Sequence, residues 1–190
     1  MARPLSDEKR SAILLAAAQV IAEHGTGGPI SKIAKQAGVA EGTIFTYFDD
    51  KDALLNALYL ALKADLAVAF RHGRPASKTL KARVQHAWER YIQWGATHPA
   101  QRRAMSQLSV SDRITDDTRQ LGAKAFEEIG ATLDEVVTTG NLKGQSPLFV
   151  AAIMESIAET TLSFIAREPD AADNYTRAGF DAFWNAVSKS

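Results

Sequence analysis

The chain has 190 residues and a formal net charge of zero, from 22 basic and 22 acidic side chains, and 46% of its residues are apolar. This apolar fraction allows a packed core, and no continuous apolar run approaches the roughly 20 residues that span a bilayer. The absence of cysteine excludes disulfides, thiol nucleophiles and thiolate metal sites. Because no segment is typical of a membrane span or of a leader with a cleavage site, we expect a cytoplasmic protein that has no membrane partner.

The first predicted helix begins after Ser6 and ends at Gly25. Ser6 is followed by two acidic residues, a combination typical of a helix N-cap with acids in the first turn. The apolar residues of this segment recur at helical spacing and form one stripe: Ile13, Leu14, Ala17, Val20 and Ile21. We expect this helix to pack across the two that follow and to complete a three-helix unit.

The stretch from Pro29 to Lys51 predicts two short helices separated by a tight turn. Gly38 ends the first of them, because glycine adopts the left-handed conformation of a helix exit without steric cost. The second begins at about Glu41, and its residues Ile44 and Phe48 share one face. Two such helices joined by a short glycine-containing turn are typical of a helix-turn-helix.

The residues of this stretch follow the pattern I-x-x-IA-x-x-AGV-x-x-GT-(hydrophobic)-F-x-YF-x-x-K-x-x-L. The pattern resembles the DNA-binding domain of the tetracycline-repressor (TetR/AcrR) family, and the match runs from about Ser6 to Leu58. The resemblance implies an all-α fold of about nine helices, with a three-helix DNA-binding head in residues 1–51. It also implies an effector-binding and dimerisation bundle in residues 52–190, entered through a linking helix at about 51–70.

In the rest of the chain, apolar residues recur at helical spacing and no alternating strand pattern occurs, so the sequence predicts helices to the end. Asp49 or Asp50 caps the linking helix, and the later helices are expected at about 80–95, 99–108, 121–139, 147–167 and 175–187. This part of the chain is similar to the family only in length and number of helices.

The second helix of the helix-turn-helix is expected to lie in the major groove of DNA. By resemblance, Thr43 and Tyr47 contact the DNA backbone or base edges, and Thr46 is the third main candidate. Ser31 lies near the N-terminus of the preceding helix, where free N–H groups attract phosphate. Lys51, at the start of the linking helix, can pair with a phosphate or remain a solvated lysine.

Three residues depart from the family pattern. Ala40 stands where a serine or threonine is common, so a helix cap is lost. Phe45 stands where a tyrosine is usual, and it can offer only packing or contact with a thymine methyl group. Glu41 can accept a hydrogen bond from cytosine N4 or point away from the phosphates. In addition, residues 1–51 hold six basic and six acidic side chains, without the basic surplus usual for DNA-binding domains.

The last two helices are rich in apolar and small residues and need cover on more than one face. They can be buried within their own bundle, or they can form a two-fold homodimer interface of two helices from each subunit. The family resemblance favours the homodimer.

An apolar cavity in the bundle is a second expectation, because ligands often bind between the helices of a bundle. Glu155 and Glu159 share a helix face and repel unless a cationic ligand or a neighbouring basic side chain compensates them. The alternative is that the aromatic side chains of this part of the chain, such as Trp88 and Phe126, belong to an ordinary core without a cavity. The predicted effector-binding residues are Trp88, Tyr91, Trp94, His98, Met105, Phe126, Met154, Glu155, Glu159 and Phe164.

Catalysis, a metal site and a cofactor are not expected, because the four histidines lack metal-ligand spacing and no nucleophile or phosphate-loop motif occurs. The sequence favours a transcriptional regulator, a repressor released from a palindromic operator by a small-molecule effector of unknown identity. Two alternatives stay open: a helical small-molecule carrier with a vestigial head, and a DNA-binding factor that has no effector.

Overall fold

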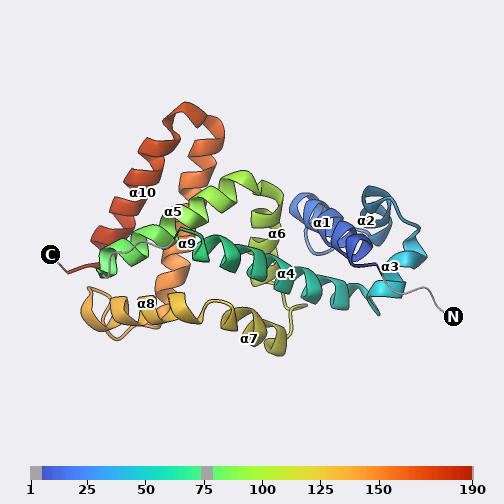
Figure 1. Cartoon of the computed structure of the whole chain (residues 1–190), viewed down its shortest axis with the longest axis horizontal. Coiled ribbons are helices and arrows are strands. Elements are labelled where there is room, and N and C mark those ends of the chain that lie inside the picture. The colour runs from blue at the N-terminus through green and yellow to red at the C-terminus, as the bar shows by residue number, and fades with distance from the viewer. Residues whose placement is uncertain (1–5, 74–78, 190) are drawn as a thin grey trace. The chain divides into compact units, whose positions relative to one another are not determined.

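The computed structural model describes residues 6–73 and 79–189, without the side chain of Glu128, and these ranges fold entirely into helices and their connections (Figure 1). The all-α expectation is confirmed. The helices are α1 (Asp7–His24), α2 (Ile30–Ala37), α3 (Glu41–Tyr47), α4 (Lys51–Arg71), α5 (Leu80–Thr97), α6 (Pro99–Ser109), α7 (Asp116–Lys124), α8 (Glu127–Thr139), α9 (Pro147–Arg167) and α10 (Ala172–Val187), with a 3₁₀ turn at Pro169–Ala171.

The chain folds into two compact units that interleave along the sequence. The first unit comprises residues 1–65 and 98–125, and the second comprises residues 66–97 and 126–190. Helices α6 and α7 therefore belong with the N-terminal helices, and α4 continues from the first unit into the second. The predicted division into a DNA-binding domain, residues 1–51, and an effector-binding and dimerisation domain, residues 52–190, concerns function and stays a prediction.

The first unit is built on local signals that the sequence contains. The Ser6 hydroxyl accepts a hydrogen bond from the backbone N–H of Lys9 at 3.3 Å, which confirms the predicted N-cap of α1. Gly38 ends α2 with φ +67°, in the left-handed region. The apolar stripe of α1 is buried, with Ile13 and Ile21 fully covered, and α1 packs against both α2 and α6.

The linking helix α4 is capped by Asp50, whose carboxylate accepts a hydrogen bond from the Ala53 backbone N–H at 2.8 Å. Its first turns carry buried leucines, including Leu54, Leu55 and Leu58. These side chains complete the core of the first unit.

The single helix expected over residues 121–139 is two helices, α7 and α8, that meet around Ala125. Gly122 packs so closely on Tyr59 that an added Cβ atom would lie 2.9 Å from its ring, and both residues belong to the first unit. The Phe126 ring instead meets Phe70 edge-on, with centroids 5.8 Å apart, in the second unit. The apolar residues of this segment therefore face two different cores, and the helix is interrupted between them.

In the second unit, α5, α8, α9 and α10 pack into a bundle. At its centre the Trp88 ring is fully buried and stacks on Phe183, with centroids 6.5 Å apart. Gly179 lets α10 approach the other helices, because a Cβ atom there would lie 2.4 Å from the Thr161 hydroxyl and 2.7 Å from the Trp88 ring.

Among the described residues, two helices, α4 and α9, are long and apolar enough by length and composition to cross a membrane, contrary to the expectation from the sequence. Long core helices of globular proteins have the same composition. In α4, 44% of the most apolar window is buried within the chain, whereas in α9 only 28% is buried. Helix α9 therefore leaves a broad apolar surface uncovered within a single chain.

Candidate functional site

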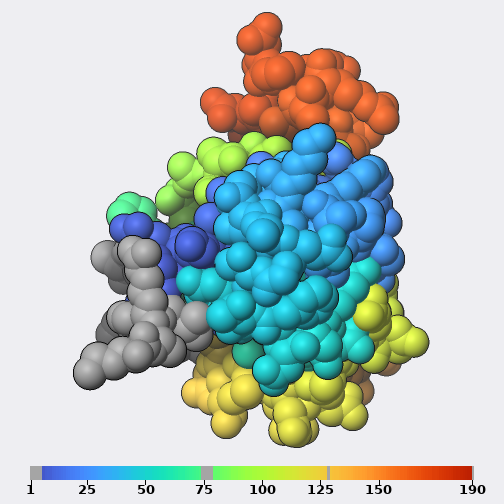
Figure 2. Space-filling view, turned by 90° about the vertical axis from the view of Figure 1, so that its right-hand side faces the viewer, coloured from blue at the N-terminus to red at the C-terminus, as the bar shows by residue number. Residues whose placement is uncertain are grey.

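Helix α3 presents a buried side and an exposed side. Ile44 is completely buried beneath it, and Phe48, directly after the helix, is 5% exposed. On the outer side, Glu41, Phe45 and Thr46 are exposed. Figure 2 shows this helix, in cyan, on the open face of the first unit. Three of the five sequence-predicted contact residues of α3 thus lie on an accessible surface, whereas Ile44 and Phe48 hold the helix in place.

Tyr47, the last residue of α3, is half-buried and fixed by a long-range contact. Its phenol oxygen accepts a hydrogen bond from the Ser6 backbone N–H at 3.1 Å. The phenol can therefore still donate its own hydrogen to a partner. Thr46 donates its hydroxyl hydrogen to the Gly42 carbonyl at 3.3 Å, one turn earlier, and Thr43 is half-buried.

The two residues predicted to meet phosphate lie at the N-terminal ends of α2 and α4. Ser31 is exposed in the first turn of α2, and Lys51 is half-buried at the first position of α4. Burial and, next, the positive charge of Arg113 lower the pKa of Lys51, while the Asp52 carboxylate raises it. Lys51 therefore has a second cation in its neighbourhood.

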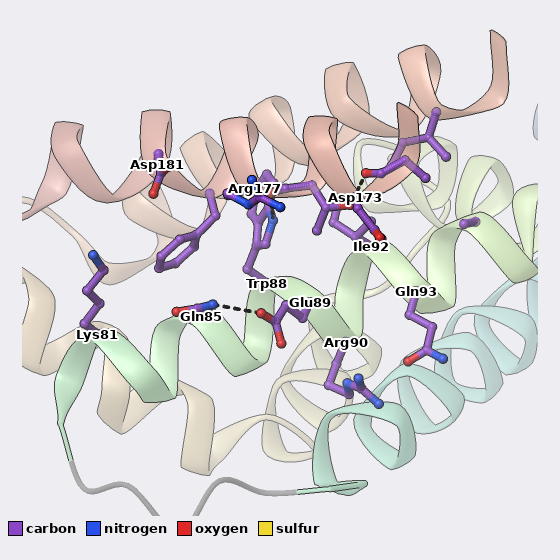
Figure 3. Close-up of a pocket in the computed structure, with 15 residues that line it drawn as sticks. Lys81, Gln85, Trp88, Glu89, Arg90, Ile92, Gln93, Asp173, Arg177 and Asp181 are labelled. Carbon is purple, nitrogen blue, oxygen red and sulfur yellow. Dashed lines mark hydrogen bonds between the residues drawn. The ribbon is translucent and has the colours of Figure 1, made fainter. Parts of the chain in front are cut away.

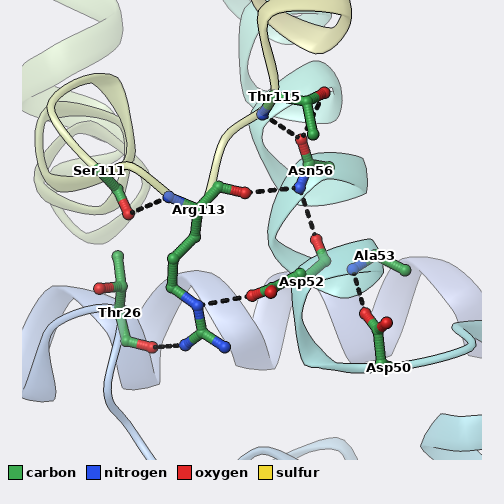
Figure 4. A network of polar contacts seen from close by, with 8 residues as sticks. All are labelled: Thr26, Asp50, Asp52, Ala53, Asn56, Ser111, Arg113 and Thr115. Atoms are coloured by element: carbon green, nitrogen blue, oxygen red, sulfur yellow. Dashed lines mark hydrogen bonds and ion pairs between the residues drawn. The ribbon is translucent and has the colours of Figure 1, made fainter.

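That second cation, Arg113, lies in the loop between α6 and α7 and was not among the residues predicted from the sequence. Figure 4 shows its side chain between Thr26 and Asp52. The guanidinium Nε lies 2.5 Å from the Asp52 carboxylate, and Nη1 donates to the Thr26 carbonyl at 3.2 Å. Arg113 and its partners are 61 and 87 positions apart, and no local sequence pattern indicates such a pairing.

The predicted effector-binding residues are divided between the two units. His98 and Met105 belong to the first unit and the other eight to the second. Within the second unit, the Tyr91 hydroxyl donates to the Glu159 carboxylate at 3.3 Å, and the Tyr91 and Trp94 rings lie 6.4 Å apart. The hydrogen bond from Tyr91 partly offsets the repulsion between the carboxylates of Glu155 and Glu159 on α9.

Trp88 faces a different neighbour. Its indole N–H donates to the Thr176 carbonyl of α10 at 2.9 Å, and the residue lines a groove of about 600 Å³ between α5 and α10 (Figure 3). Charges of both signs line this groove, among them Glu89 on α5 and Arg177 on α10. Phe164 lines a separate hollow of about 460 Å³ on α9 and α10 and packs on Tyr175. The predicted set thus does not converge on either of these cavities.

Metal chemistry finds no support in the part of the chain that the structure describes. No group of three or more histidine, aspartate or glutamate side chains within it could hold a metal ion.

Comparison with known proteins identifies the N-terminal domain. Residues 13–58 match the model of the family described as bacterial regulatory proteins, tetR family. A 48-residue stretch is 54% identical to a fatty acid metabolism regulator protein from Bacillus subtilis (strain 168) and covers 25% of each protein. The chain therefore matches about a quarter of the length of this curated relative.

The whole chain shares its fold with solved regulators. A TetR-family transcription regulator from Shewanella sp. PV-4 superposes with a TM-score of 0.80 at 23% identity, over 96% of this chain and 99% of that one. The transcriptional regulator FadR from Bacillus subtilis, in complex with stearoyl-CoA, superposes with a TM-score of 0.66 at 20% identity, over 93% and 98%. Residues 13–58 are thus a domain of the tetR family of bacterial regulatory proteins, and the whole chain has the fold of solved tetR-family regulators.

Proposed function

We propose that this protein is a non-catalytic transcriptional repressor that binds a palindromic DNA operator as a homodimer and leaves it when a small-molecule effector binds. The observation that carries the proposal is the exposed side of α3, held in place by buried Ile44 and by the tie between Tyr47 and Ser6. A helix-turn-helix inserts such a helix into the major groove. The protein would act in the cytoplasm, where its DNA lies.

The contact residues divide by the part of DNA that they reach. Thr43 and Thr46 point from α3 toward base edges, with Glu41 and Phe45 at the same surface. Tyr47, Ser31 and Lys51 bind phosphates, the last two at helix N-termini where partial positive charge accumulates. Phosphate contacts position the head, whereas base contacts select the sequence.

The homodimer forms through α9 and α10. Leu148 and Phe149 of α9 are 80% and 51% exposed, and Phe164 is 40% exposed. Exposed apolar side chains in this number on one helix indicate an interaction surface. A two-fold axis there makes the contact self-complementary, and two heads related by it require a palindromic operator.

The effector binds in the second unit, which holds eight of the ten residues predicted from the sequence. A long-chain acyl-CoA is the class to test first, because the fold relative FadR is described in complex with stearoyl-CoA. An apolar cation is the class to test second, because Glu155 and Glu159 lie one turn apart on α9. Release requires tighter binding of the effector to the conformation that does not bind DNA, since equal affinity shifts nothing.

The test is fluorescence anisotropy of the purified protein against labelled duplexes tiled across the DNA that flanks its own gene, at two salt concentrations. Tight binding to one duplex that survives the higher salt is the expected result. Addition of stearoyl-CoA should then lower the anisotropy, with free CoA and an apolar cation as comparison ligands.

Weak binding to every duplex, lost at the higher salt concentration, would contradict specific recognition. Such binding is the sequence-independent electrostatic contribution alone. Specific binding that no ligand reverses would favour a DNA-binding factor without an effector. Ligand binding without DNA binding would favour the carrier.

A further inference from the structure

The α6–α7 segment contributes positive charge that the helix-turn-helix segment lacks. Residues 1–65 contain seven basic and eight acidic side chains, whereas residues 98–125 contain five basic and three acidic ones. Both stretches form the first unit. The small basic surplus of the DNA-binding unit therefore comes from the segment outside the tetR-family domain.

Arg113 places one of these charges between the α1–α2 loop and the N-terminal turn of α4. Thr26, whose carbonyl binds its Nη1, lies in the loop that leads into α2, and Asp52, whose carboxylate binds its Nε, is the second residue of α4. The guanidinium thus lies at the first turn of α4, which carries Lys51, and contacts the loop that precedes Ser31. Both Lys51 and Ser31 are proposed phosphate contacts.

The loop that carries Arg113 is held firmly by polar contacts. The Asn56 side chain donates to the Arg113 carbonyl at 2.9 Å and accepts from the Thr115 backbone N–H at 3.0 Å. From α7, Arg119 donates to the carbonyls of Ser109 at 2.7 Å and Ser111 at 2.6 Å. The position of the Arg113 charge is therefore preorganised rather than left to a mobile side chain.

The Arg113 guanidinium retains donors for a further partner. Within the described part of the chain its Nη2 has no hydrogen bond or ion pair, and 32% of the side chain is exposed. Asp52 is a single carboxylate shared by two neighbouring cations, because its charge also raises the pKa of Lys51. The cluster of Lys51, Asp52 and Arg113 carries a net positive charge that a phosphate group would compensate.

We propose that Arg113 binds a phosphate of the operator backbone next to the phosphate bound by Lys51, and so extends the DNA interface beyond the helix-turn-helix. The proposal rests on the proposed function, since it requires the head to bind DNA. Asp52 and the Thr26 carbonyl orient the guanidinium, and its free Nη2 donates a charge-assisted hydrogen bond to the phosphate.

The test compares the salt dependence of DNA binding by the wild type and Arg113→Gln, on the duplex that the wild type binds most tightly. Each lost phosphate contact lowers the slope of log K against log salt by about 0.9. The dimer holds two copies of Arg113, so the slope should fall by about two. Affinity at 0.1 M salt should fall about tenfold for each lost contact.

Two further variants separate contact from positioning. Arg113→Lys keeps the charge and should keep most of the slope. Arg103→Gln removes one charge from an exposed position of the same unit, on α6, and should leave the slope unchanged. Thermal unfolding of all three variants checks that the head remains folded.

A loss of affinity in Arg113→Gln with an unchanged slope would overturn the inference, because it would assign Arg113 a positioning role only. An equal loss of slope in Arg103→Gln would also overturn it, because net charge alone would then be the cause. Failure of the wild type to bind any duplex specifically would instead remove the proposed function, and this inference with it.

Discussion

The phenol oxygen of Tyr47 and the backbone N–H of Ser6 are joined by a 3.1 Å hydrogen bond across 41 residues of chain. The contact ties the last residue of α3 to the N-cap of α1. The placement of the recognition helix therefore depends on the first helix as well as on the turn before it.

Replacement of Tyr47 by Phe removes this hydrogen bond and the phenol donor proposed for phosphate. We expect weaker binding to every DNA sequence, with the ranking of sequences unchanged, because phosphates carry no sequence information. The free energy of unfolding should fall by about 1 kcal/mol. Anisotropy with operator and scrambled duplexes measures the first effect, and urea unfolding measures the second. A changed ranking of sequences would place Tyr47 at base edges.

Replacement of Thr43 by Ala should change the preferred sequence as well as the affinity, since Thr43 is proposed to reach base edges. Binding to a set of operator variants with single base-pair changes measures the effect. Thr138→Ala is the control, because it removes a threonine hydroxyl from an exposed position on α8, away from the proposed DNA contacts. If Thr43→Ala weakened all operator variants alike, Thr43 would be a backbone contact.

Replacement of Leu148 by Glu places a charge on the proposed dimer surface of α9. Because Leu148 is 80% exposed in the single chain, its own fold should be almost unaffected. We expect dissociation to monomers at micromolar concentration, measured by sedimentation velocity. Val110→Glu changes an 86% exposed residue of the first unit and serves as control. A Leu148→Glu protein that stayed dimeric would place the interface elsewhere.

Replacement of Gly179 by Ala should lower the stability of the second unit. The added Cβ atom would lie far inside contact distance of Thr161 and Trp88, and such overpacking costs about 1–3 kcal/mol. In contrast, Gly130→Ala in α8 meets no atom within 4 Å and should stabilise the helix by about 0.5–1 kcal/mol. Thermal unfolding distinguishes the two, and equal effects would mean that α10 can move away from its neighbours.

The local part of the fold could be predicted from the sequence. The Ser6 cap, the exit of α2 at Gly38 and the Asp50 cap each depend on residues within a few positions of one another. The exposed side of α3 follows equally from helical spacing. These features need no knowledge of which distant helices pack together.

The remainder depends on tertiary packing that spacing does not encode. A helix turns about 100° per residue, so Trp88, Tyr91 and Trp94 spread over an arc of about 120° and meet different neighbours. Trp88 bonds to α10, whereas Tyr91 bonds to Glu159 of α9. Likewise, nothing near Arg113 in the sequence indicates Asp52 or Thr26 as its partners. The helix is interrupted before Phe126 because the residues on either side pack into two separate cores.

The interleaving of the two units bears on how this protein can be recombined. Helix α1 packs on α6, which lies more than 70 residues later in the chain. A chimera that joined residues 1–65 to the effector domain of another regulator would leave the apolar stripe of α1 facing a foreign surface. An exchange that also carried residues 98–125 would keep its native cover and the Arg113 contacts. New pairings of operator and effector would therefore need three coordinated crossovers, after residues 65, 97 and 125, or compensating changes along the surface that α6 covers.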